Sequence, residues 1–179
     1  MKKTTIILIV LAFITISCRG RKAPEIDFGN RENPLFGKTY QNITDIPELN
    51  HWQLRGGSII YAGKNEDGSF RFAIEEFNDE NRNIILLFVE LLPRDESGRS
   101  SRKILDSIDI KEYNEGVEFM SFACRVNGEH DSEIGAVVVW ENKEILNNIV
   151  RAWRANTNTG RFEEIDVESV DCWNPRQSG

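Results

Sequence analysis

The chain has 179 residues, of which 22 are basic and 29 are acidic. Its apolar fraction of 40% is ordinary for a folded protein and argues against a disordered chain. An acidic chain is a poor match for the phosphates of nucleic acid, which favour a basic surface, so we expect no nucleic-acid partner.

The first residues have the order of a bacterial export signal. Lys2 and Lys3 precede an uncharged, mainly apolar run from Thr4 to Ile16, and Ser17-Cys18 follows. This run of about 13 residues is too short for a membrane-spanning helix, which needs about 20. The sequence therefore predicts a signal peptide over residues 1–17.

The pair Ser17-Cys18 resembles the lipobox of bacterial lipoproteins, in which a small residue precedes the modified cysteine. The resemblance implies cleavage before Cys18, lipidation of its thiol, and anchoring to a membrane of the bacterial cell envelope, on the outer membrane or the periplasmic face. Residues 18–36 would then form a flexible tether. The alternative is ordinary secretion, with cleavage near Ser17 and an incidental cysteine.

The mature chain of about 160 residues corresponds to one domain, and we expect residues 37–179 to form a single globular β-rich domain. Loss of Lys2 and Lys3 leaves it with 20 basic and 29 acidic residues, a net charge of −9. With Cys18 lipidated, Cys124 and Cys172 remain. Because thiols outside the cytoplasm usually pair, we predict a disulfide between them; the alternative is a reduced, buried pair.

A short helix is expected first in chain order, from Thr44 to about Trp52, with Pro47 in its first turn. Gly56-Gly57 should break the chain. A second helical turn is expected at Lys143–Asn147. Strands are predicted at 58–62, 70–74, 84–92, 103–110, 117–119, 122–126, 134–140, 149–154 and 161–165, before a tail at 170–173.

Turn sequences join several of these strands into hairpins. Asp67-Gly68 and Asn127-Gly128 supply the positive φ angles that tight hairpins need, and Thr157–Gly160 is a four-residue turn. Consecutive hairpins favour antiparallel pairing. The predicted fold is mainly β (α+β), with one antiparallel sheet of eight or nine strands and one or two short helices.

The sequence contains no nucleophile elbow, phosphate-binding loop or dinucleotide motif, so no catalytic or cofactor-binding residue is assigned. His51 and His130 are too few for a zinc site once the cysteines pair. A nucleophilic Cys124–His130 pair is disfavoured, because Cys124 lies on the buried face of its strand. The acidic pairs are interpreted as solvated; they are Glu75-Glu76, Asp79-Glu80 and Glu163-Glu164.

The tryptophans are the remaining candidates for a binding surface. Trp140 follows a run of valines and is expected in the core. Trp153 lies between two arginines, opposite an acidic strand, which cross-strand ion pairs would explain. The alternative is an exposed partner surface formed by Arg151, Trp153, Arg154 and Trp173.

These observations favour a lipid-anchored, non-catalytic envelope domain that binds a protein or a carbohydrate. One alternative is an envelope hydrolase that uses carboxylates or His130. Another is a structural lipoprotein without a discrete ligand. A pocket gathering His130 and Asp131 would favour the hydrolase, whereas exposed Trp153 or Trp173 would favour binding.

Overall fold

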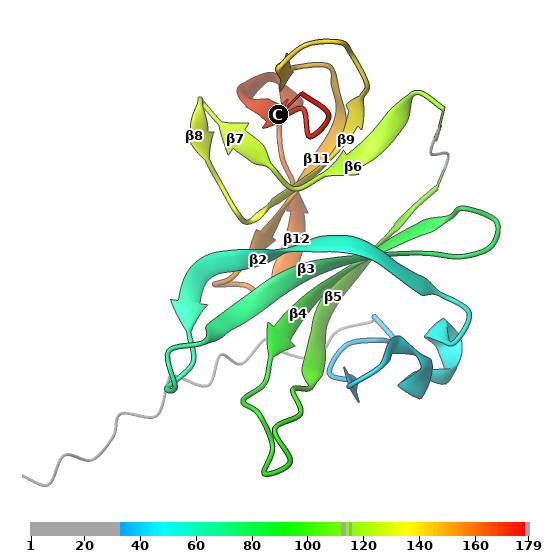
Figure 1. The fold of residues 1–179 in the computed structure, drawn as a ribbon, viewed down its shortest axis with the longest axis vertical. Helices are drawn as coiled ribbons and strands as arrows, with labels where there is room; N and C mark the ends of the chain where they lie inside the picture. Colours follow the sequence, from blue (N-terminus) through cyan, green and yellow to red (C-terminus); the bar gives the residue numbers. More distant parts are fainter. Residues whose placement is uncertain (1–32, 112–113, 115, 178–179) are drawn as a thin grey trace, which may run out of the picture.

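Strands dominate the part of the chain that the computed structural model describes, which is residues 33–111, 114 and 116–177. These residues form thirteen strands and three 3₁₀ turns (Figure 1). The predicted signal peptide, Cys18 and nearly all of the predicted tether lie outside the described residues. The expected mainly β, antiparallel fold is confirmed, but the strands form three sheets instead of one.

All strand pairs in the three sheets are antiparallel. Sheet A has the order β1 (Thr39–Tyr40), β5 (Arg102–Ile110), β4 (Ile84–Leu91), β3 (Phe70–Asn78) and β2 (Gln53–Lys64). Sheet B has the order β12 (Arg161–Glu164), β11 (Ile149–Asn156), β9 (Ile134–Val139) and β6 (Glu118–Ser121). Sheet C has the order β10 (Ile145–Leu146), β13 (Val170–Trp173), β7 (Cys124–Val126) and β8 (Glu129–His130).

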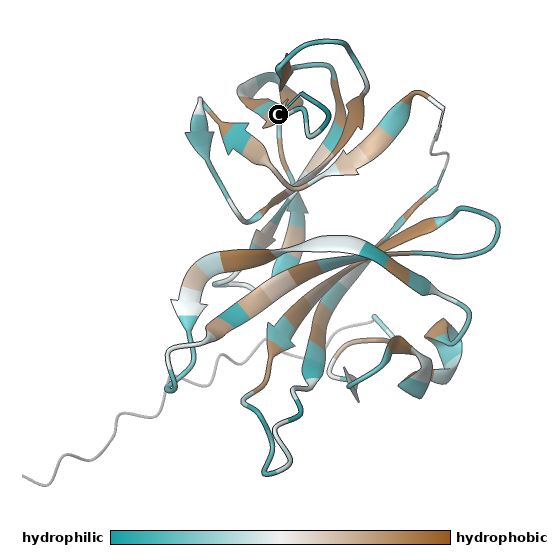
Figure 2. Ribbon diagram, viewed as in Figure 1, coloured by the Kyte–Doolittle hydropathy of each residue, from teal (hydrophilic) through white to brown (hydrophobic). Residues whose placement is uncertain are grey.

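Sheet B lies between sheets A and C, and a hydrophobic core fills each of the two interfaces. Trp153 and Val137 of sheet B pack with Phe88 of sheet A in the first core. Ala136 and Ala152 pack with the cysteines of sheet C in the second. Figure 2 shows that hydrophobic residues follow the strands, while the loop between β4 and β5 is mainly hydrophilic. The described residues therefore form a stack of sheets with no α-helix.

Strand β4 shows that sheet A is buried on both faces. Its alternate residues Leu86 and Phe88 enter the core shared with sheet B, whereas Leu87 and Val89 face the opposite side. This burial confirms the prediction that the apolar run is a central strand. The outer face is covered by the segment before β2, which includes the 3₁₀ turns η1 (Ile43–Asp45) and η2 (Pro47–Leu49).

A buried polar cluster fastens this covering segment to sheet A. The Tyr40 hydroxyl donates to one carboxylate oxygen of Glu75, and Arg102 Nε donates to the other at 2.5 Å. Burial, reinforced by the neighbouring Glu75 carboxylate, raises the pKa of the Tyr40 phenol, so Tyr40 stays a proton donor. The expectation that Glu75 is a solvated charge is wrong, because the side chain is buried against both partners.

Three local predictions need correction. The expected helix near Thr44 is instead the pair of turns η1 and η2. Gly56-Gly57 lies within β2 and does not break the chain, because β2 continues with bulges along β3. Lys143–Asn147 is not helical: Ile145 pairs with Trp173 in sheet C, and the neighbouring Leu146 is buried.

The Asn127-Gly128 hairpin confirms its prediction and positions the next strand. Both residues have positive φ, 53° and 82°, as a tight hairpin turn requires. The turn brings β8 back along β7, with His130 opposite Arg125. His130 is thereby placed at the outer edge of sheet C.

Candidate functional site

A concave surface lies where the edge strands of the three sheets approach one another. Strands β2, β6 and β8 are the end strands of sheets A, B and C, and residues of all three line a groove with a cavity volume of about 420 Å³. This volume lies in the range of small-ligand sites. The groove is lined by Gly57, Ser58, Tyr61, Phe119, Met120, Ser121, Phe122, Ala123, His130 and Pro175.

One wall of this groove, which we call the edge groove, carries exposed aromatic rings. Tyr61 is 62% exposed, and its ring centroid lies 6.3 Å from that of His130 and 5.5 Å from that of Phe70. The Tyr61 backbone N–H donates to Ser132 Oγ at 3.0 Å, so the loop before β9 fixes this part of β2. The wall therefore offers a phenol and an imidazole, and the Phe70 ring lies beside the phenol.

The opposite wall consists of β6 and the residues directly after it. Five consecutive residues, Phe119 to Ala123, line the edge groove. Successive side chains of a strand point to opposite faces, so a consecutive lining includes the main chain itself. The same holds for Gly57 and Ser58 on β2. The edge groove thus exposes main-chain edges as well as side chains.

The end of the edge groove is held by the C-terminal segment. Asn174 is buried, and its Nδ2 donates to the carbonyl oxygens of Glu141 at 3.0 Å and Lys143 at 2.8 Å. These bonds fix the position of the adjacent Pro175, which lines the groove. They also account for the non-helical backbone near Lys143, since a helix would use those carbonyls internally.

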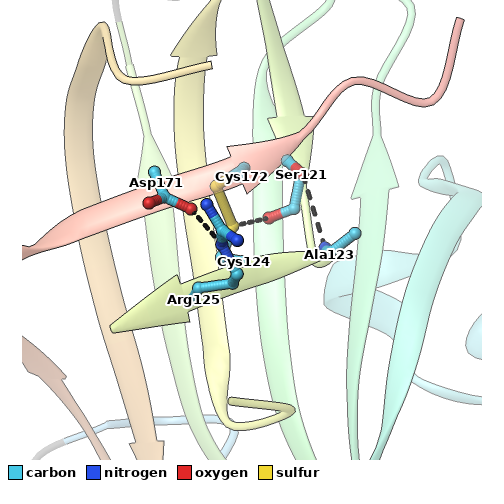
Figure 3. Close-up of a disulfide and its surroundings, with 6 residues drawn as sticks. All are labelled: Ser121, Ala123, Cys124, Arg125, Asp171 and Cys172. Atoms are coloured by element: carbon cyan, nitrogen blue, oxygen red, sulfur yellow. Dashed lines mark hydrogen bonds and ion pairs between the residues drawn. A yellow bond between two sulfur atoms is a disulfide. The ribbon is translucent and has the colours of Figure 1, made fainter. Parts of the chain in front are cut away.

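A disulfide between Cys124 and Cys172 lies next to the Phe119–Ala123 wall of the edge groove, as the sequence predicted (Figure 3). The two cysteines are direct cross-strand partners in β7 and β13, and both are fully buried. The Trp173 backbone N–H donates to the Ala123 carbonyl at 2.9 Å beside the bridge. The disulfide therefore joins the strand that follows Ala123 to the C-terminal strand. Its bonded sulfur is unavailable as a nucleophile, so Cys124 and His130 do not form a catalytic pair.

A second, shallower hollow of about 170 Å³ lies on the other side of β2. Its walls include the exposed side chains of Leu54 and Ile59 together with Ala73 of β3. Gly57 and Ser58 line both this outer hollow and the edge groove. Strand β2 therefore separates two hollows at a point where its own side chains are small.

Gly57 is required at this point by its backbone. Its φ is 154°, and a Cβ there would lie 2.3 Å from the Ile74 carbonyl oxygen. Any other residue would force β2 away from β3. The glycine that the sequence suggested as a chain break thus brings the edge strand close to its neighbour.

Glu76 is the carboxylate with the most perturbed protonation near β2. Burial raises its pKa to about 7, and the positive charge of Arg55 opposes this shift only partly. A Cβ built on Gly56 would lie 3.4 Å from Glu76 Oε2, which places the carboxylate over that glycine. The expectation that Glu76 is freely solvated is therefore wrong.

The alternative of an exposed partner surface formed by Arg151, Trp153, Arg154 and Trp173 is not supported at Trp153, which is buried. Trp153 is only 3% exposed and belongs to the core between sheets A and B. Arg151 pairs with Glu164 at 3.0 Å, as expected from the cross-strand interpretation. Arg154 instead pairs with Asp131 at 2.8 Å and with Glu133.

The two exposed tryptophans lie apart from the edge groove lining. Trp173 is 37% exposed, and the Arg125 guanidinium lies 5.0 Å from its ring centroid. Trp140 was expected in the core but is 42% exposed, with the Arg176 guanidinium 5.6 Å from its ring. It follows β9 directly, beyond the buried end of that strand. Both rings are therefore partly covered by arginines.

The described residues contain no group of three or more His, Cys, Asp or Glu side chains placed to hold a metal ion. No helix in the described part of the chain is long and apolar enough to cross a membrane. No protein-family model matches the sequence, and no curated protein or solved structure matches it significantly. Functional argument therefore depends on the residues themselves.

Sequence reasoning singled out His130 and the cysteines but missed the rest of the groove. Tyr61, Phe119 and Phe122 were predicted only as strand residues, and Met120 lay between two predicted strands. A signal was present in Tyr61 and Phe70, two aromatic residues on either side of the Asp67-Gly68 turn. This pair of aromatic residues did not reveal which strand of another sheet would face it.

Proposed function

We propose that this chain is a lipid-anchored, non-catalytic domain of the bacterial cell envelope that binds a partner molecule in the edge groove. The export signal and Cys18 support the anchor and the location outside the cytoplasm. The Cys124–Cys172 disulfide agrees with an oxidising compartment. The observation that carries the binding proposal is the edge groove, where exposed rings and open strand edges meet.

The composition of the edge groove favours binding over hydrolysis. Its lining residues include His130 and Tyr61 but no carboxylate to act as a partner acid or base. Asp131, which would have supported a hydrolase, is engaged by Arg154 at 2.8 Å. A protein segment fits the apolar walls and main-chain edges, whereas a sugar ring would stack on Tyr61.

A photo-crosslinking amino acid placed at position 61 tests the binding proposal in living cells. Position 140 is the matched control, because Trp140 is also an exposed aromatic but does not line the edge groove. We expect a discrete adduct from position 61 and none from position 140. Adduct digestion by protease or by glycosidase separates a protein partner from a glycan. Equal labelling at the two positions, or none, would contradict the proposal.

The anchor is tested separately with Cys18→Ser. Labelled palmitate should enter the wild-type protein and not the variant, and the variant should leave the membrane fraction, because acylation supplies the hydrophobic anchor. The control is Cys124→Ala with Cys172→Ala, which removes the other two cysteines. Undiminished labelling of the Cys18→Ser protein would contradict lipidation at this residue.

A further inference from the structure

The inference begins with the open edge of β2. This strand has 12 residues, and among the described residues it pairs with β3 alone. Alternate residues of an edge strand direct their N–H and C=O groups away from the sheet. Tyr61 already uses one such group, since its N–H is bonded to Ser132 Oγ. Among the described residues, the part from Gln53 to Ile59 is at least partly exposed and pairs with no strand on its outer edge, whereas Ile60 is fully buried.

The small side chains of β2 leave this edge accessible. Gly56, Gly57 and Ser58 follow one another where the two hollows meet. Edge strands that must avoid pairing are usually short, bulged or charged along the edge. The register of β2 with β3 shifts between Leu54 and Gly56 and again between Ile60 and Lys64. The part between these bulges is uncharged and begins with three small residues, so a second backbone can approach it closely.

The two hollows fit the alternation of an added strand. Successive side chains of a strand point to opposite faces, about 3.3 Å apart along the chain. A strand beside β2 would direct one set of side chains toward the outer hollow with Leu54 and Ile59. The other set would enter the edge groove against Phe119 and Phe122. Both hollows are lined mainly by apolar residues, which calls for apolar side chains on both faces.

Strand β2 is basic, although the chain as a whole is acidic. The strand carries Arg55 and Lys64 and no acidic residue. Within the described residues, neither forms an ion pair closer than 4.0 Å, although the positive charge of Arg55 acts on the nearby Glu76 carboxylate. The Lys64 ammonium lies 5.4 Å from the Phe70 ring centroid. Two basic residues near the two ends of the strand complement acidic residues near the ends of a bound segment.

We propose that β2 binds an extended, acidic-flanked segment of a partner protein as an additional antiparallel strand of sheet A. Main-chain hydrogen bonds along Gln53–Ile59 supply affinity, and the outer hollow and the edge groove select apolar side chains at alternate positions. This inference rests on the function proposed above. The inference goes further than that function, because it names a polypeptide as the ligand and main-chain pairing as the mode of binding.

The test uses a displayed library of random twelve-residue peptides against the detergent-solubilised full-length protein. Enriched peptides should have apolar residues in the middle and acidic residues toward their ends. Synthetic versions are then N-methylated at one residue at a time. Methylation at every second residue should weaken binding about tenfold, because it removes a main-chain donor, while the intervening positions change little.

Protein variants locate the bound peptide. Ile59→Lys should weaken binding about tenfold by placing a charge in the outer hollow, and Arg55→Glu should weaken acidic peptides most. Val150→Lys is the matched control, because Val150 is also an exposed apolar strand residue and lines neither hollow. If Ile59→Lys fails to fold, the methylation series on the wild-type protein still decides the question.

Several outcomes would overturn strand addition. Equal effects of methylation at all positions would mean that the peptide binds elsewhere, or that it binds through its side chains alone. A library that yields no peptide, together with a glycan adduct from position 61, would reject strand addition while leaving the proposed groove function intact. A concentration-dependent dimer that Ile59→Lys abolishes would show that a second copy of this chain occupies the edge.

Discussion

At the scale of single residues, Trp153 shows how a one-residue irregularity decides which face of a strand a side chain occupies. The pairing of β11 with β9 shifts between Ile149 and Arg151, which leaves Val150 as an extra residue. After this bulge, Ala152 faces sheet C and Trp153 faces sheet A. Sequence alternation alone cannot locate a bulge, so it cannot fix which side of the sheet Trp153 occupies.

The buried position of Trp153 predicts a large loss of stability on truncation. Trp153→Ala should lower the free energy of unfolding by about 3–5 kcal/mol, because it opens a cavity in the core between sheets A and B. Trp140→Ala, at the exposed ring, is the control and should cost under about 1 kcal/mol. Urea unfolding followed by circular dichroism measures both. Similar losses for the two variants would contradict the assignment of Trp153 to the core.

Glu76 predicts a pH dependence of stability. Its folded-state pKa of about 7 exceeds its ordinary value of 4.5, so the folded state binds more protons between these values. The free energy of unfolding should therefore fall as pH rises from about 4.5 to 7, by on the order of 2 kcal/mol from this residue.

The variant Glu76→Gln isolates this contribution, because it keeps the shape and removes the charge. Compared with the wild type, it should gain stability at pH 8 and gain little at pH 4. Glu80→Gln, in the exposed turn after β3, is the matched control. Urea titrations at the two pH values measure the free energy of unfolding of each protein. If Glu76→Gln shows the same difference between the two pH values as the wild type, the pH dependence belongs to other groups.

At the scale of elements, the cross-strand disulfide has a predictable effect on the free energy of unfolding. Cys124 and Cys172 are 48 residues apart in sequence, so the bridge restricts a long loop in the unfolded chain. Replacing both cysteines by alanine should lower the free energy of unfolding by about 4 kcal/mol in the chain-entropy model. Chemical unfolding of the two proteins measures the difference. Reductant should destabilise the wild type and leave the double variant unchanged.

Individual strands were largely predictable, but their division into sheets was not. Alternation and apolar runs located β3, β4, β5, β9, β11 and β12 to within a few residues. Hairpin turns such as Asn127-Gly128 then fixed local pairing. The stacking of sheets depends instead on distant contacts, for example the pairing of Ile145 with Trp173, which no local pattern contains.

The candidate site was less predictable for the same reason. His130 and the Cys124–Cys172 pair could be identified because their residue types are uncommon in the sequence. The edge groove depends on where three strand edges meet, and its wall at Phe119–Ala123 is ordinary apolar sequence. Gly56-Gly57 illustrates the ambiguity: glycines mark either a break or a close backbone approach, and only the neighbouring β3 decides between them.

At the scale of the whole molecule, the sheets are joined by polar links as well as by cores. Asp106 of β5 accepts a hydrogen bond from Asn33 Nδ2 at 3.2 Å and another from the Phe162 backbone N–H at 2.9 Å. It thus connects sheet A both to the segment before β1 and to sheet B. The Phe162 ring also lies 5.8 Å from the Phe88 ring, between centroids, across the same interface.

These links predict that the three sheets unfold together. Sheet B contributes to both sheet-to-sheet cores, so its loss would expose sheets A and C at once. Tryptophan fluorescence and circular dichroism should give coincident urea transitions with one midpoint, as for a two-state domain. Asp106→Ala should move both transitions equally to lower urea, because it weakens the interface without separating the sheets. Two resolved transitions in the wild type would instead mean that sheet A and the B–C pair are independent folding units, and the edge groove would then lie between separable parts.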